Sequence, residues 1–227
     1  MRVLIACEES QAVCKAFREK GHEAYSCDII ECSGGHPEWH IMADVLEVLN
    51  PKSTFEGELP GIEFFTMDGE LHSFVGKWDL IIAHPPCTYM SKAGARWMFP
   101  KAGMVCQDRL KKAMEAKAFF LEMLNADCPR IAVENPVPLK IVELPKHTQK
   151  IQPYEYGEPF SKATCLWLKG LPTLTPTNIV SEYKPFLPSN TGAFSRGGGG
   201  SRGVAHDAKT ASKTFPGVAK AMADQWG

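Results

Sequence analysis

The stretch RVLIACEESQAVCKAFREKGHEAYSCDI, residues 2–29, decides the fold class. It opens with a short apolar run, Arg2–Cys7, and continues with apolar residues at helical spacing until Gly21, a residue typical of helix ends. A second β-rich run, Ala24–Ile29, follows. A strand, a helix and a strand in this order form a βαβ unit, which predicts two parallel strands.

The rest of the chain repeats this alternation of strands and helices. The segment 108–127 is strongly amphipathic, and its expected buried face carries Leu110, Met114, Ala118, Leu121 and Leu124. The other expected elements are a short strand with a helical turn in 40–49, strands at 78–83, 130–136 and 163–172, and a closing helix at 215–227. We therefore predict an α/β fold with a mostly parallel, doubly wound sheet.

Residues 1–227 are expected to form a single domain with two embellishments. The dipeptide Asp68-Gly69 between two β-rich arms predicts a hairpin insertion near 60–76. The glycine-rich segment near 189–204 predicts a flexible loop.

Composition favours a protein of the reducing cytoplasm. The sequence has no run of 18 apolar residues, which argues against a membrane span, and its eight cysteines are scattered singly, which favours free thiols. The net charge is −1, yet residues 136–227 carry more basic than acidic groups while residues 1–135 carry the reverse. This asymmetry favours the C-terminal part as the phosphate-facing part.

In open α/β sheets, ligands bind at the carboxyl ends of the strands, so the residues that follow each strand are candidate site residues. Asp28 follows the second strand, where an acidic side chain suits a ribose diol, and Asp44 follows the third. The strand Trp78–Ala83 ends in His84-Pro85-Pro86-Cys87, and the next core strand ends in Glu134-Asn135-Pro136. The two prolines stiffen the backbone and hold Cys87 in one position.

These motifs resemble the cytosine-5 DNA methyltransferase family. DLIIAHPPCTYMS matches its Pro-Cys motif, and RIAVENPVP matches its Glu-Asn-Val motif. The resemblance spans roughly residues 2–138. Small bacteriophage-encoded members of the family look similar to this sequence. It implies a Rossmann-like class I methyltransferase fold, S-adenosyl-L-methionine as cofactor, and a cytosine flipped out of DNA as substrate.

The family's chemistry implies a role for each matching residue. Cys87 is the nucleophile that adds to cytosine C6, and Glu134 is the acid at N3, for which a raised pKa is expected. The expected substrate contacts are Pro85, Pro86, Asn135, Lys162 and Thr164. The expected cofactor contacts are Cys7, Glu8, Ser10, Asp28, Ile29, Asp44 and His84.

The sequence departs from the family in several places. Its first loop, ACEESQAV, lacks glycine, and Glu8 and Glu9 are the expected partners of the cofactor's amino group. No arginine motif is apparent, so Lys162 and Thr164 are the nearest counterparts. The usual target-recognition domain is absent, which leaves AFSRGGGGSRG, with Arg196 and Arg202 for phosphate contacts, or a protein partner for targeting. The loop after Cys87, with Ser91, Lys92, Gly94 and Arg96, either closes over the nucleotide or is an ordinary connection.

Other interpretations remain open at this point. Cys27, Cys32, His36 and His40 have a spacing that could supply four zinc ligands, although no metal is expected. An amino-group methyltransferase for adenine or cytosine would need an aromatic residue where Cys87 stands. A catalytically silent nucleic-acid-binding relative, or an enzyme acting on RNA or a free nucleotide, also fits the sequence.

Overall fold

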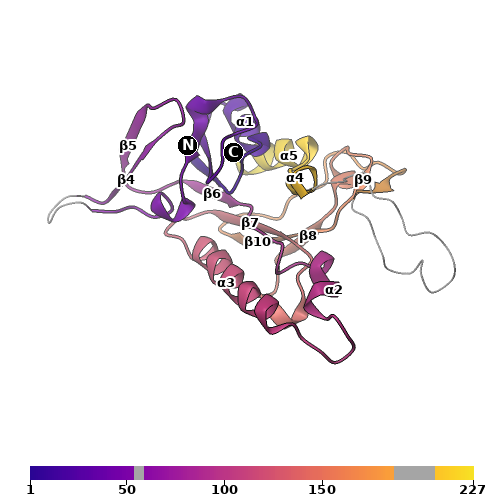
Figure 1. Cartoon of the computed structure of the whole chain (residues 1–227). Helices are drawn as coiled ribbons and strands as arrows, with labels where there is room; N and C mark the ends of the chain where they lie inside the picture. The colour runs from indigo at the N-terminus through magenta and orange to yellow at the C-terminus, as the bar shows by residue number, and fades with distance from the viewer. Residues whose placement is uncertain (54–58, 187–207) are drawn as a thin grey trace.

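The structure is a computed structural model that describes residues 1–53, 59–186 and 208–227 (Figure 1). In these residues seven strands form one sheet in the order β3-β2-β1-β6-β7-β10-β8. The strands are β1 (Arg2–Ala6), β2 (Glu23–Asp28), β3 (His40–Met42), β6 (Leu80–Ala83), β7 (Ile131–Pro136), β8 (Gln149–Ile151) and β10 (Thr164–Lys169). The first five in this order pair in parallel, and β10 runs antiparallel to both of its neighbours. The predicted mostly parallel sheet is confirmed.

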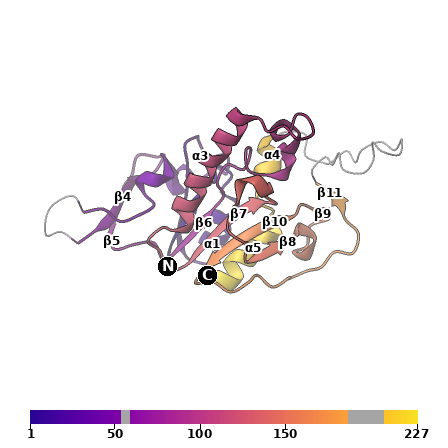
Figure 2. The ribbon, with the colours of Figure 1, turned by 90° about the horizontal axis from the view of Figure 1, so that it is seen from below.

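Helices cover both faces of the sheet. Helices α1 (Ala12–Glu19) and α5 (Pro216–Trp226) lie on one face, and α3 (Gln107–Leu124) lies on the other, the side from which Figure 2 views the molecule. Successive side chains of β1 point to opposite faces of the sheet, so this strand contributes to the hydrophobic core on each face. Val3 and Ile5 pack toward α1 and α5, whereas Leu4 and Ala6 pack toward α3. The sheet is therefore doubly wound, as predicted.

The buried face of α3 differs from the predicted one. Its fully buried residues are Ala113, Phe120 and Met123, while Met114 and Ala118 are exposed. The ring of Phe120 packs edge-on against Trp167 of β10, with centroids 4.9 Å apart. We attribute the rotation of the helix to this aromatic contact, because the large ring needs the deepest position.

Shorter elements decorate the sheet. Strands β4 (Gly61–Phe65) and β5 (Leu71–Val75) form an antiparallel hairpin whose turn contains Gly69 at φ +91°. The remaining named elements are β9 (Phe160–Ser161), β11 (Lys184–Pro185), α2 (Ala95–Met98) and α4 (Ala208–Ser212). The predicted glycine-rich loop, with Arg196 and Arg202, lies outside the described residues. Across the described ranges, no helix has the length and apolarity needed to cross a membrane.

The strand order has a topological switch point between β1 and β6. The chain leaves β1 toward β2 on one side, and β6 continues toward β7 on the other, so the connections diverge between these two neighbouring strands. Ligands of open α/β sheets bind outside the carboxyl ends of strands at such a switch point. The loops that follow β1 and β6 begin at Cys7 and His84.

Candidate functional site

His84 and Glu134 lie side by side at the ends of β6 and β7. The parallel register pairs Ala83 with Val133, so the next two residues also stand next to each other. Alternation points both side chains to the face of α1 and α5. Nδ1 of His84 lies 3.2 Å from Oε2 of Glu134, and the two side chains are only 8% and 14% exposed. His84 was predicted as a cofactor contact, but the strand register commits Nδ1 of its ring to Glu134.

The surroundings of the His84–Glu134 pair favour the charged form of both side chains. Burial opposes protonation of His84, but the hydrogen bond to Glu134 and the charges of Glu134 and Glu8 raise its pKa. Burial opposes ionisation of Glu134, but the His84 hydrogen bond and the positive charge of Lys162 lower its pKa. The predicted raised pKa of Glu134 is therefore wrong, because two cationic groups face this carboxylate.

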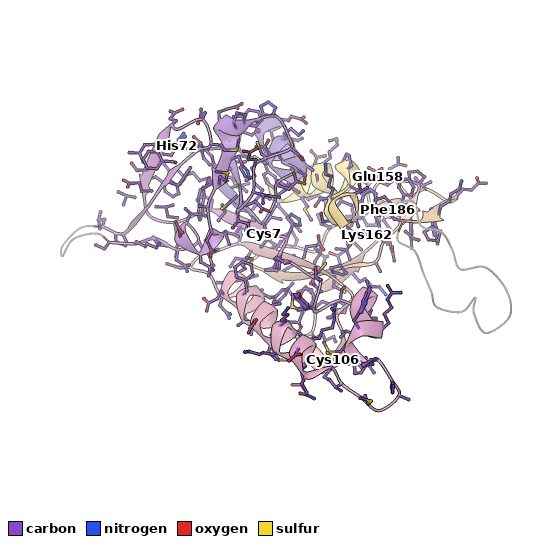
Figure 3. The ribbon with its side chains drawn as sticks, viewed as in Figure 1. Cys7, His72, Cys106, Glu158, Lys162 and Phe186 are labelled. Carbon is purple, nitrogen blue, oxygen red and sulfur yellow. The ribbon has the colours of Figure 1, made fainter. Side chains whose placement is uncertain are left out.

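A small cavity adjoins the His84–Glu134 pair. Its volume of about 20 Å³ leaves room for roughly one water molecule. Lys162, Thr164 and Phe215 line it together with the pair, so the structure brings both predicted substrate contacts of this segment to Glu134. Lys162 lies beside the C-terminal helices in Figure 3, and its Nζ stands 5.9 Å from the Phe215 ring centroid.

Cys87 follows β6 in a tight turn that is joined to the loop after β7. The Cys87 carbonyl accepts hydrogen bonds from the backbone N–H groups of Met90 and Ser91. Two further backbone bonds link the loops: Leu139 donates to Met90 over 2.7 Å, and Lys92 donates to Val137 over 2.9 Å. The Cys87 loop is therefore fixed to the loop that follows Glu134.

The Cys87 thiol is influenced by the same charged groups. Burial and then the charge of Glu134 raise its pKa, whereas Lys162 acts to lower it. Pro85 is buried and Pro86 exposed, so the dipeptide anchors the turn on one side and faces solvent on the other. Cys87, Glu134 and Lys162 thus belong to one electrostatic environment, in which the resting thiol is protonated at neutral pH.

Asn135 points away from this site. Strand alternation places its side chain on the α3 face, where it is fully buried and its Nδ2 donates to the carbonyl of Pro136. The prediction for Asn135 was a contact to the loop or to the base. Of these two, the geometry favours the support of the loop.

A basic and aromatic surface follows Cys87, and the sequence predicted no site role for Arg109, Tyr89 or Trp97 in it. Nη2 of Arg109 donates to the Thr88 carbonyl over 2.7 Å, and its guanidinium lies over the rings of Tyr89 and Trp97. Arg96 stacks at 3.9 Å on Trp97, which is 50% exposed. A sequence signal was available, because 92–112 contains six basic residues and one acidic residue.

The predicted loop residues divide between the inside and the surface. Lys92 and Arg96 are exposed, whereas Ser91 and Gly94 are buried. A Cβ at Gly94 would come within 2.6 Å of Arg109 Nη2. Ser91 and Gly94 are therefore structural parts of this loop.

The loop after β1 contains Glu8, whose side chain has a structural role. Its carboxylate accepts hydrogen bonds from the backbone N–H groups of Val13 (2.7 Å) and Cys14 (3.1 Å), at the start of α1. The residue before α1, Gln11, makes no capping bond, so these N–H groups need another acceptor. The carboxylate of Glu8 thus supports the start of α1, and its predicted contact to the cofactor stays a prediction.

Gln11 is a further structural residue that the sequence did not reveal. Its side-chain amide donates to the His36 carbonyl and accepts from the His36 N–H. These two bonds tie the first loop to the segment that follows β2. Both Cys7 and Gln11 adopt φ +58°, so the loop reaches the left-handed region without glycine.

Asp28 and Asp44 gather near Cys7 at the ends of β1, β2 and β3. Burial, followed by the charges of Asp28, Cys27 and Asp44, raises the pKa of the Cys7 thiol. Asp28 is partly buried, and burial raises its pKa although neighbouring backbone N–H groups oppose this. Ile29 is 74% exposed beside it, and Ser10 is partly buried. This half of the edge offers carboxylates and an uncovered apolar side chain.

The four residues considered as zinc ligands do not converge. His40 uses both ring nitrogens in the protein: Nδ1 pairs with Ser26 Oγ and Nε2 with the Ile30 carbonyl, each over 2.9 Å. His36 pairs with Glu38. Among the residues that the structure describes, no three His, Cys, Asp or Glu side chains are grouped to hold a metal. All eight cysteines are free thiols.

Comparisons with known proteins find solved structures that resemble this chain. No family model matches the sequence, and no curated protein matches it. A solved structure described as a candidate DNA modification methyltransferase, encoded within a prophage of E. coli, resembles this chain with a TM-score of 0.43 and 15% sequence identity. The match covers 79% of this chain and 52% of that one, so the chain spans about half the length of that protein.

Proposed function

We propose that this protein is an S-adenosylmethionine-dependent methyltransferase that acts at C5 of cytosine in DNA. The carrying observation is that the Cys87 loop and Glu134 converge at the ends of neighbouring strands, with hydrogen bonds between their loops. The second cluster, around Cys7, lies at the same edge of the sheet. A nucleophile and a proton-exchanging carboxylate beside a nucleoside-type site fit this reaction best.

The β1–β3 half of the edge fits the cofactor. Asp28 ends β2 and Asp44 follows the neighbouring strand β3, and their carboxylates suit the hydroxyl and amino groups of a nucleoside. The exposed side chain of Ile29 offers an apolar contact for a base. S-adenosylmethionine, when bound, supplies an electrophilic methyl group. The left-handed backbone at Cys7 lets the first loop turn sharply although it lacks glycine.

The β6–β7 half fits the base. The sulfur of Cys87 adds to C6, the C5=C6 electron pair shifts to C4=C5, and N3 takes up a proton. Glu134 is the group that exchanges this proton and accepts a hydrogen bond from the 4-amino group. Lys162 stabilises negative charge on the sulfur, since it acts on both Cys87 and Glu134.

The surface after Cys87 supports DNA as the substrate. The exposed Lys92 and Arg96 suit phosphate groups, and the exposed ring of Trp97 suits stacking with a base. A base stacked in a duplex cannot reach a buried thiol, so the target cytosine must be extruded.

Labelled cofactor and product analysis test this proposal. Purified protein is incubated with methyl-labelled S-adenosylmethionine and unmethylated DNA, and the DNA is digested to nucleosides for mass spectrometry. We expect labelled 5-methylcytosine from the wild-type protein and none from Cys87→Ala. Labelled N4-methylcytosine or N6-methyladenine would overturn the cytosine-5 assignment, and no label with cofactor still bound would overturn methyl transfer to DNA.

A further inference from the structure

The two ring nitrogens of His84 face different surroundings. Nδ1 is hydrogen-bonded to Oε2 of Glu134, whereas Nε2 is buried and has no protein partner. The ring also lines the small cavity that it shares with Lys162 and Thr164. A protonated imidazole in this arrangement can release its Nδ1 proton to Glu134 and take it back at the same nitrogen.

We propose that His84 is a positioning residue that stores a proton for Glu134 and delivers it when the cytosine ring is attacked. This inference rests on the proposed function and adds to it the source of the proton. The 3.2 Å bond, the near-complete burial of both side chains and the adjoining cavity carry it.

The proton moves from His84 through Glu134 to N3 of the base and returns to His84 in the same catalytic cycle. The Cys87 thiol gives its proton to water as its sulfur bonds to C6. The C4=N3 electron pair then moves onto N3, which takes a proton from a Glu134 oxygen, and Glu134 in turn receives the Nδ1 proton of His84. After methylation, the C5 proton leaves to water and the carbon–sulfur bond breaks. The released thiolate takes a proton from water, and the N3 proton returns through Glu134 to His84. The pair therefore ends each cycle as it began.

The charges around His84 favour such storage. Glu134 on β7 and Glu8 before α1 favour the protonated ring, whereas Lys162, from the segment between β9 and β10, opposes it. Lys213, which precedes α5, also lines the cavity. Because the pKa of His84 is raised and that of Glu134 lowered, the stored proton rests on His84 before the base binds.

The pH dependence of methyl transfer tests this role. Single-turnover rates are measured for the wild-type protein, His84→Asn and the control His147→Asn, whose ring lies near Trp167. An Asn amide keeps a donor toward Glu134 but carries no titratable proton. We expect His84→Asn to lose at least about tenfold in maximal rate. We also expect the high-pH fall of its rate profile to move to lower pH, because a carboxyl group without the histidine loses its proton at lower pH than the pair does. If the high-pH fall in the rate lies at the same pH in His84→Asn as in the wild-type protein, the proposal is overturned.

A second readout does not depend on methylation. In ¹⁵N-histidine NMR spectra, we expect His84 to titrate above the ordinary histidine value and to move downward in Glu134→Gln. An ordinary titration in the wild-type protein would overturn the stored proton. If the pair titrates as expected but DNA receives no 5-methyl group, the proposed function fails and the role toward N3 fails with it, so the two failures are distinguishable.

Discussion

Two cysteines follow neighbouring strands of the sheet, and their surroundings differ. Cys7, after β1, lies among Asp28, Cys27 and Asp44, all of which disfavour a thiolate. Cys87, after β6, has one opposing carboxylate, Glu134, and one supporting cation, Lys162. The same residue type at the same edge therefore meets only opposing groups in one half and a nearby cation in the other. Burial raises the pKa of both thiols, and what distinguishes their charged surroundings is the placement of Lys162 near Cys87.

The largest expected effect comes from exchanging the two sulfurs one at a time. Cys87→Ser should lower methyl transfer at least about 1,000-fold, because serine oxygen is a far weaker nucleophile at neutral pH. Cys7→Ser should keep the rate within about tenfold, since no bond to Cys7 forms in the reaction. Single-turnover assays measure both. Equal losses from the two variants would remove the distinction between the halves.

The next effect concerns the acidic half. Asp28→Asn should weaken binding of S-adenosylhomocysteine by roughly 10- to 100-fold, because a charge-assisted hydrogen bond contributes about 1.5–3 kcal/mol. Isothermal titration calorimetry gives the affinity. Glu134→Gln is the matched control and should bind the cofactor product as the wild-type protein does. Unchanged affinity in Asp28→Asn would contradict the placement of the nucleoside in this half.

The smallest effect isolates Lys162. Lys162→Met removes the cation beside Cys87, so the pKa of its thiol rises and its thiolate fraction falls at every pH below that pKa. We expect alkylation of Cys87 by iodoacetamide at pH 7.5 to slow by about tenfold, which corresponds to one pKa unit. Mass spectrometry of the peptides measures the extent of alkylation at Cys87 and at Cys7. Lys150→Met, on β8, is the control and should leave the Cys87 rate unchanged.

The sequence predicted the framework of the molecule well. The βαβ pattern of residues 2–29 led to the parallel sheet, and the rule that ligands bind at strand ends singled out Asp28, Cys87 and Glu134. These features depend on local patterns that a single sequence carries. The short strands β8 and β9 were not predicted, because two or three residues carry no periodic signal.

The electrostatics of the site could not be predicted in the same way. The pairing of His84 with Glu134 depends on the register of β6 and β7, and the approach of Lys162 depends on the segment before β10. The structural role of Glu8 was not predicted for a similar reason, since only the structure shows that its carboxylate meets N–H groups at the start of α1. Such relations arise from tertiary packing, which spacing along the chain does not encode.

The backbone bonds that join the loops after β6 and β7 have a consequence for protein engineering. Backbone hydrogen bonds join Met90 to Leu139 and Lys92 to Val137. The two loops therefore form one structural unit although they lie far apart in the sequence. A one-residue deletion in either loop would shift the other out of register and displace the Cys87 sulfur. Grafting this chemistry onto another α/β scaffold therefore requires transplanting both loops together.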